Sequence, residues 1–155
     1  MIASAMISNP SVLIADEPTT ALDVTVQGQV LAVLDDLINE THSSLLLITH
    51  DFGVVASICD EVLVMYRGRI VERGPTAAVF ARPRHPYTLG LLGAIPRREL
   101  RGALLNAIPG QVPPIEVPIR GCSFRDRCAL ASEACRADPE LDHVQHAVEC
   151  WHPLN

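Results

Sequence analysis

The first half of the chain alternates short apolar runs with one long stripe of apolar residues at helical spacing. The runs at residues 12–15 and 45–49 have the length of strands, and we expect both strands to be buried. Between them, apolar side chains recur at helical spacing from Val26 to Ile38, which predicts a helix capped by Thr25. The order strand, helix, strand predicts a right-handed βαβ unit with parallel strands.

The pattern then predicts smaller elements that end in a proline-rich, cysteine-bearing region. Arg67-Gly68 separates two apolar runs and suits the tight turn of a β-hairpin. Four prolines lie within residues 109–118, which we expect to form an extended linker. We expect strands at residues 61–66 and 69–73, a helix end at 1–8, short helices at 54–58, 76–81 and 88–95, and helical composition at 126–136.

Composition narrows the classes of function. The chain has 155 residues and a net charge of −6, which argues against nucleic acid as a partner. All twelve basic residues are arginines, so the chain contains no Walker A phosphate loop, whose lysine reaches the nucleotide phosphates. Neither a signal peptide nor an apolar run of membrane-spanning length is present, and we expect a cytosolic protein.

Ionisable side chains follow both predicted parallel strands. Asp16 and Glu17 come directly after the first strand, and His50 follows the second. Ligands of open parallel sheets bind beyond the C-terminal strand ends, so we expect these three groups around one crevice. Their chemistry suits phosphoryl transfer, with Asp16 for Mg²⁺, Glu17 for the attacking water and His50 as a donor to the γ-phosphate.

Three motifs carry a resemblance to a known family. The motif Leu13-Ile14-Ala15-Asp16-Glu17-Pro18-Thr19-Thr20-Ala21-Leu22-Asp23 resembles the Walker B motif and D-loop of ABC transporter ATPases. Downstream, Leu47-Ile48-Thr49-His50-Asp51 resembles their H-switch, and His85-Pro86-Tyr87-Thr88 resembles the oligopeptide/dipeptide importer branch. The resemblance implies that Asp16 binds Mg²⁺, Glu17 is the catalytic carboxylate, His50 senses the γ-phosphate and Asp23 lies at an ATPase dimer interface.

The resemblance also implies a fold and its limits. We expect an α/β fold, namely a partial RecA-like P-loop NTPase sheet of parallel strands plus a terminal antiparallel hairpin, followed by a small cysteine-bearing extension. Residues 1–81 would be the C-terminal part of the ATPase domain, and residues 82–155 the oligopeptide-transporter extension. The Walker A loop, Q-loop and signature motif would lie outside this chain, so we expect the chain alone neither to bind ATP tightly nor to hydrolyse it.

Four of the five cysteines lie near the end of the sequence, at positions 122, 128, 135 and 150. Cysteine thiolates bind zinc or iron–sulfur clusters, and both remain open from the residues alone. In a continuous helix Cys128 and Cys135 would stand about 10.5 Å apart, so either the helix breaks between them or they serve different centres. The tail resembles that of peptide-importer ATPases with an iron–sulfur cluster, which favours [4Fe–4S] on Cys122, Cys128, Cys135 and Cys150.

The resemblance implies a set of partners and leaves two alternatives open. The partners would be a second ABC ATPase subunit, identical or different, two membrane permease subunits and, indirectly, an extracytoplasmic peptide-binding protein. The chain would then lie peripherally at the cytoplasmic face of the membrane. One alternative is a non-enzymatic iron–sulfur or zinc-binding regulatory module. The other keeps the transporter role with nickel or glutathione as cargo.

Overall fold

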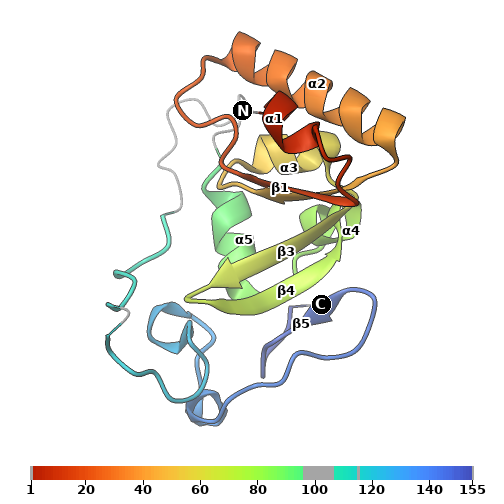
Figure 1. Ribbon diagram of the computed structural model, residues 1–155. Helices are drawn as coiled ribbons and strands as arrows, with labels where there is room; N and C mark the ends of the chain where they lie inside the picture. Colours follow the sequence, from red (N-terminus) through yellow and green to blue (C-terminus); the bar gives the residue numbers. More distant parts are fainter. Residues whose placement is uncertain (1, 96–106, 115, 155) are drawn as a thin grey trace. The chain divides into compact units, whose positions relative to one another are not determined.

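The computed structural model describes residues 2–95, 107–114 and 116–154, which form two compact units, 1–59 and 60–155 (Figure 1). Part of the predicted extension, residues 96–106, lies outside the described residues. The fold is α/β, with a two-stranded parallel sheet in the first unit and a separate three-stranded antiparallel sheet in the second. No helix in the described ranges is long and apolar enough to span a membrane.

The first unit contains the predicted strand, helix and strand. Its strands β1 and β2 pair in parallel, with Val12 opposite Ser44 and Asp16 opposite Ile48. This register confirms that the two strands run in parallel and brings their C-terminal ends side by side. The elements are α1 (Ile2–Met6), β1 (Val12–Asp16), α2 (Val24–Thr41), β2 (Ser44–Ile48) and α3 (Phe52–Ile58).

The expectation that both strands are buried is wrong for one face of the sheet. Leu13 packs with Met6 of α1 and Leu34 of α2 in the core of the first unit. On the opposite face, Ile14 is 63% exposed and its register partner Leu46 is 46% exposed. Period-2 alternation sends successive side chains to opposite faces, and only one of those faces is covered. The sheet therefore carries an uncovered apolar surface.

The cap of helix α2 lies two residues earlier than expected. The cap is Asp23, whose carboxylate accepts hydrogen bonds from the backbone N–H groups of Thr25 and Val26, each at 3.0 Å. The prediction of Thr25 as the cap was wrong. The helix ends at His42, which adopts a left-handed conformation with φ of 53°.

The second unit is built on a hairpin. Strands β3 (Glu61–Tyr66) and β4 (Arg69–Pro75) pair antiparallel, as predicted, although β4 runs two residues further than expected. Arg67 and Gly68 both have positive φ, 48° and 77°, which is typical of a two-residue hairpin turn. On the other side of β4, the short strand β5 (Ala147–Val148) adds Val148 opposite Glu72.

Two helices pack with this hairpin. Helix α4 (Thr76–Ala81) follows β4 and buries Val79 in the core of the unit, where it joins Tyr66, Val71 and Phe124. Helix α5 (Pro86–Gly93) begins earlier than the predicted residue 88. The Nδ1 atom of His85 accepts the N–H of Tyr87, and proline at the first helical position fits the helix start, so together they fix its beginning.

Residues 126–136 do not form the expected helix. The region instead contains two short 3₁₀ turns, η2 (Arg125–Arg127) and η3 (Glu133–Arg136). No continuous helix therefore joins Cys128 to Cys135. The segment before η2 lies close to η3, because the N–H of Cys122 donates to the carbonyl of Cys135 at 2.9 Å. Gly121 permits this approach, since a Cβ there would lie 2.5 Å from the Cys135 oxygen and its φ is +83°.

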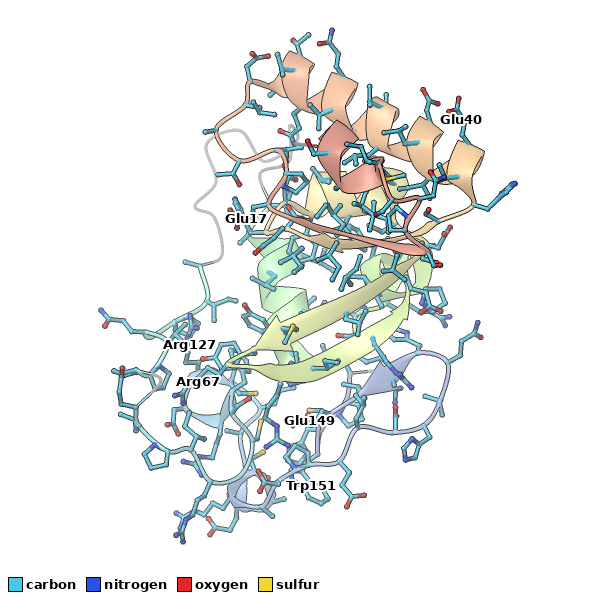
Figure 2. All side chains as sticks on the ribbon, viewed as in Figure 1. Glu17, Glu40, Arg67, Arg127, Glu149 and Trp151 are labelled. Carbon is cyan, nitrogen blue, oxygen red and sulfur yellow. The ribbon has the colours of Figure 1, made fainter. Side chains whose placement is uncertain are left out.

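The proline-rich segment is docked rather than free. Among its described residues, 109–114 and 116–118, the carbonyl of Pro109 accepts a hydrogen bond from Arg127 at 2.9 Å. Arg67 donates to the carbonyl of Pro114 at 2.6 Å. Figure 2 labels both arginines. The described part of the segment thus contains no helix or strand, as expected. Hydrogen bonds from Arg67 and Arg127 hold it against the second unit, which was not expected.

Candidate functional site

The ends of β1 and β2 bring Glu17 and His50 together. These residues are 33 positions apart, and Nδ1 of His50 lies 3.0 Å from Oε1 of Glu17. The backbone N–H of Glu17 donates to the carbonyl of Ile48 at 2.8 Å, so the parallel pairing itself sets this proximity. Thr20 donates its hydroxyl to the other carboxylate oxygen of Glu17 at 2.7 Å. Thr20 was not predicted as a site residue, and only its place three residues after Glu17 in a turn could have indicated it.

The carboxylate of Glu17 is held in its ionised form. The hydrogen bond from Thr20, followed by that from His50, lowers the pKa of Glu17 below its usual value. The side chains are open to solvent, with 45% of Glu17 and 78% of His50 exposed. Asp16 is exposed as well, and its carboxylate has no hydrogen bond or ion pair within the described residues. The site therefore offers the ionised carboxylate of Glu17 as a hydrogen-bond acceptor, next in sequence to the exposed carboxylate of Asp16.

Two further aspartates at this end of the sheet serve as helix caps. Asp23, expected at a subunit interface, caps α2 as described above. Asp51 caps α3 by accepting the N–H groups of Gly53 and Val54. Gln27 of α2 donates to Asp51 at 3.2 Å, and this bond is the main reason why the pKa of Asp51 is lowered. Sequence analysis did not identify the contact between Gln27 and Asp51.

The four C-terminal cysteines lie in the second unit, three of them in or against its core. Cys122 and Cys135 are buried in its core, whereas Cys128 and Cys150 are half-buried free thiols. Burial, with the neighbouring thiols of Cys122, Cys128 and Cys135 adding to it, raises the pKa of Cys150 to about 11. Burial also raises the pKa values of Cys122 and Cys128. The thiols of Cys122, Cys128 and Cys150 are therefore protonated near neutral pH.

This group does not form a compact site for a single ion. Within the described residues, no three His, Cys, Asp or Glu side chains gather closely enough to hold one metal ion. A single zinc requires four ligand atoms within about 2.3 Å of one point. In a [4Fe–4S] cluster each thiolate binds its own iron, so the four sulfurs stand further apart.

A buried carboxylate that sequence analysis missed joins three parts of the second unit. Glu72 of β4 is fully buried. It accepts the N–H of Arg84 at 2.7 Å, the N–H of His85 at 2.9 Å and Nε2 of His146 at 2.6 Å. Arg84 in turn contacts the carbonyl of His146 and pairs with Asp142 at 3.0 Å. The hairpin, the start of α5 and the C-terminal tail therefore meet at Glu72.

The first residue of the motif His85-Pro86-Tyr87-Thr88 is a buried neutral histidine. Burial lowers the pKa of His85 from 6.5 to about 4, although nearby Glu72 opposes the shift. Its Nδ1 accepts from Tyr87, so the proton of the neutral ring lies on Nε2, which has no partner within the described residues. The motif thus has a structural role here, in capping α5.

This neutral histidine should make the second unit sensitive to acid. Below pH 6.5 the unfolded chain takes up a proton at His85 that the folded chain refuses until about pH 4. Stability is therefore lost as pH falls through this window, by about 2 kcal/mol between pH 7 and pH 5. Urea unfolding followed by the fluorescence of the single tryptophan, Trp151, measures this loss.

The matched variant for this prediction is His85→Asn, which keeps a capping side chain but does not titrate. Burial raises the pKa of Glu149, which shifts stability in the opposite direction, but both proteins share that residue. The difference in pH dependence between the two proteins therefore isolates His85. An equally steep loss of stability in His85→Asn would contradict the assignment.

Comparison with known proteins adds a family to this geometry. A family model described as the C-terminal region of oligopeptide/dipeptide transporters matches residues 71–135. "Probable peptide ABC transporter ATP-binding protein y4tR" of Sinorhizobium fredii is 50% identical over 97% of this chain and 46% of its own length. The oligopeptide transport ATP-binding proteins OppD of Haemophilus influenzae and Salmonella typhimurium are 47% and 51% identical, over 97% and 92% of this chain and 47% and 42% of their lengths. The chain therefore spans less than half the length of these relatives.

Proposed function

The chain corresponds to the C-terminal part of the ATP-binding subunits in the oligopeptide/dipeptide ABC transporter family, and from this we propose that it carries the metal- and water-binding half of an ATP site in a peptide importer. The observation that carries the proposal is the contact of Glu17 with His50 at the ends of two parallel strands. The exposed apolar face around Ile14 and Leu46 supports further elements packing on this sheet, as in a larger RecA-like domain.

Each group at the strand ends has a role in hydrolysis. Asp16, exposed and without a protein partner in the described ranges, would hold Mg²⁺, which neutralises phosphate charge. Glu17 would accept a proton from the attacking water. The water oxygen would bond to the γ-phosphorus while the bond from that phosphorus to ADP breaks. Thr20 and His50 hold the Glu17 carboxylate in place. When nucleotide is bound, His50 would turn its ring to donate to the γ-phosphate.

The proposal includes partners by way of the family. Asp23 would lie where two ATPase subunits meet, and its capping bond to α2 would keep the preceding loop in shape. Two permease subunits and an extracytoplasmic peptide-binding protein would complete the importer at the cytoplasmic face of the membrane. Because the chain contains no lysine for a phosphate loop, residues 1–155 alone would neither bind ATP tightly nor hydrolyse it.

A hybrid protein tests this function. In it, residues 1–155 replace the matching C-terminal part of OppD of Salmonella typhimurium, which is 51% identical over that region. We expect the hybrid to hydrolyse ATP and to restore oligopeptide uptake in cells that lack OppD. Residues 1–155 alone should show no MgATP binding by calorimetry. A folded hybrid without ATPase activity, or micromolar MgATP affinity of the chain alone, would contradict the proposal.

We also propose that Cys122, Cys128, Cys135 and Cys150 hold a [4Fe–4S] cluster. The proposal is supported by the common core that holds Cys122 and Cys135, with Cys128 packed against it, and by the effect of these three thiols on the pKa of Cys150. A bound cluster would supply a redox-active iron centre, and binding would release the thiol protons. Anaerobic purification followed by visible absorption, iron and acid-labile sulfide analysis tests it. One zinc per chain without sulfide would contradict the cluster.

A further inference from the structure

Cys150 reaches the other three cysteines by a different route along the chain. Cys122, Cys128 and Cys135 lie within one short stretch whose turns are joined by the bond from Cys122 N–H to the Cys135 carbonyl. Cys150 comes two residues after β5, at the end of a tail that returns to the hairpin. Its position therefore depends on how that tail is attached to β4.

The backbone attachment of the tail is small. Strand β5 contributes two residues to the sheet, and the N–H of Glu149 adds a bond of 2.9 Å to the carbonyl of Val71. A two-residue strand gives little stability by itself. Arg69 of β4 also pairs with Glu149 at 2.7 Å. Figure 2 labels Glu149 and Trp151 in the tail.

The side-chain attachment that reaches the buried Glu72 comes from His146, directly before β5. Its Nε2 lies 2.6 Å from Oε1 of the fully buried Glu72, and its own side chain is 19% exposed. The backbone of β4 approaches the same residue closely, because a Cβ at Gly74 would lie 3.1 Å from the Cα of His146. His143 lies three residues earlier on the same tail and is exposed, so it is a natural comparison.

We propose that His146 is a positioning residue for the four-cysteine site, because its bond to Glu72 holds the tail on β4 and thereby keeps Cys150 beside Cys122, Cys128 and Cys135. The inference rests on the proposed cluster only for its function, since the positioning itself is a property of the chain without metal. It makes assembly of the site depend on a contact outside the ligand set.

Alkylation of Cys150 measures this positioning directly. In the docked tail the Cys150 thiol is half-buried, and its sulfur accepts the N–H of His152 at 3.3 Å, which limits the access of iodoacetamide. Release of the tail exposes this thiol to solvent. Because access then no longer limits the reaction, the alkylation rate at Cys150 should rise roughly tenfold.

The experiment uses the full metal-free chain and maps alkylation by mass spectrometry. His146→Ala should raise the rate at Cys150 roughly tenfold while leaving Cys122 within about threefold of the original rate. His146→Gln, which keeps an N–H donor for Glu72, should restore protection, and His143→Ala should have no effect. Gly74→Ala, which crowds the His146 backbone, should release Cys150 without removing either partner of the bond.

Two results would overturn the proposal. One is an unchanged Cys150 rate in both His146→Ala and Gly74→Ala. The other is an equal gain at Cys122 and Cys150, which would mean that the whole unit opens instead of the tail alone. Iron content of the same variants, after anaerobic expression, should fall in His146→Ala and stay unchanged in His143→Ala. If the original chain binds no iron, the cluster proposal fails, whereas the alkylation pattern still decides the role of His146.

Discussion

Replacing Glu72 by alanine is expected to lower the free energy of unfolding of the 60–155 unit by about 3–5 kcal/mol. The Glu72 carboxylate is fully buried and accepts hydrogen bonds from the backbone of Arg84, the backbone of His85 and the ring of His146. Alanine leaves all three donors without their acceptor, and only the ring of His146, which is 19% exposed, can turn to water instead. The loss is large because the buried donors are left unpaired, in addition to the loss of the bonds themselves.

Urea unfolding followed by Trp151 fluorescence measures this effect, since the single tryptophan lies in the tail that Glu72 holds. The matched control is Glu133→Ala, which removes a carboxylate that is 81% exposed and pairs with Arg136. We expect that control to change stability by less than about 0.5 kcal/mol, because exposed ion pairs contribute little. Similar losses in the two variants would contradict the role assigned to Glu72.

The parts of the fold that could be predicted are those set by local pattern. The spacing of apolar residues indicated the parallel strands, and the positive-φ turn at Arg67-Gly68 follows from a local signal. The approach of Glu17 and His50 followed from topology, because parallel strands place their C-terminal ends at one edge. The hairpin turn has its whole signal in neighbouring residues, whereas the approach of Glu17 and His50 needs only the order strand, helix, strand.

The parts that could not be predicted depend on contacts distant in the sequence. Glu72 follows buried Val71, so strand alternation would place it on the solvent side, yet the tail residue His146 covers it 74 positions later. Residues 126–136 have helical composition, but they form separate turns, and the backbone of Cys135 accepts a hydrogen bond from the N–H of Cys122. The exposure of one face of β1 depends on which elements pack on that face. The apolar content of the strand alone does not determine this.

Replacing Glu17 by glutamine in the hybrid protein described above is expected to lower the rate of ATP hydrolysis by about 10²–10⁴-fold. The amide keeps the size of the carboxylate and an oxygen that can accept the Thr20 hydroxyl, but it cannot take a proton from water. Affinity for MgATP should therefore stay within about threefold, because the group lost is needed in the transition state and not for binding.

Glu40→Gln is the matched control for this variant, since Glu40 is an exposed carboxylate near the end of α2. Figure 2 labels Glu17 and Glu40, which lie away from each other in the first unit. The control should hydrolyse ATP at the original rate. Asp16→Asn should instead weaken the dependence of nucleotide binding on Mg²⁺, because its carboxylate is assigned to the metal. A Glu17→Gln hybrid that keeps more than about a tenth of the original rate would contradict proton transfer to Glu17, since general-base catalysis contributes at least about a hundredfold. Loss of nucleotide affinity together with rate would instead mean that Glu17 shapes the binding site.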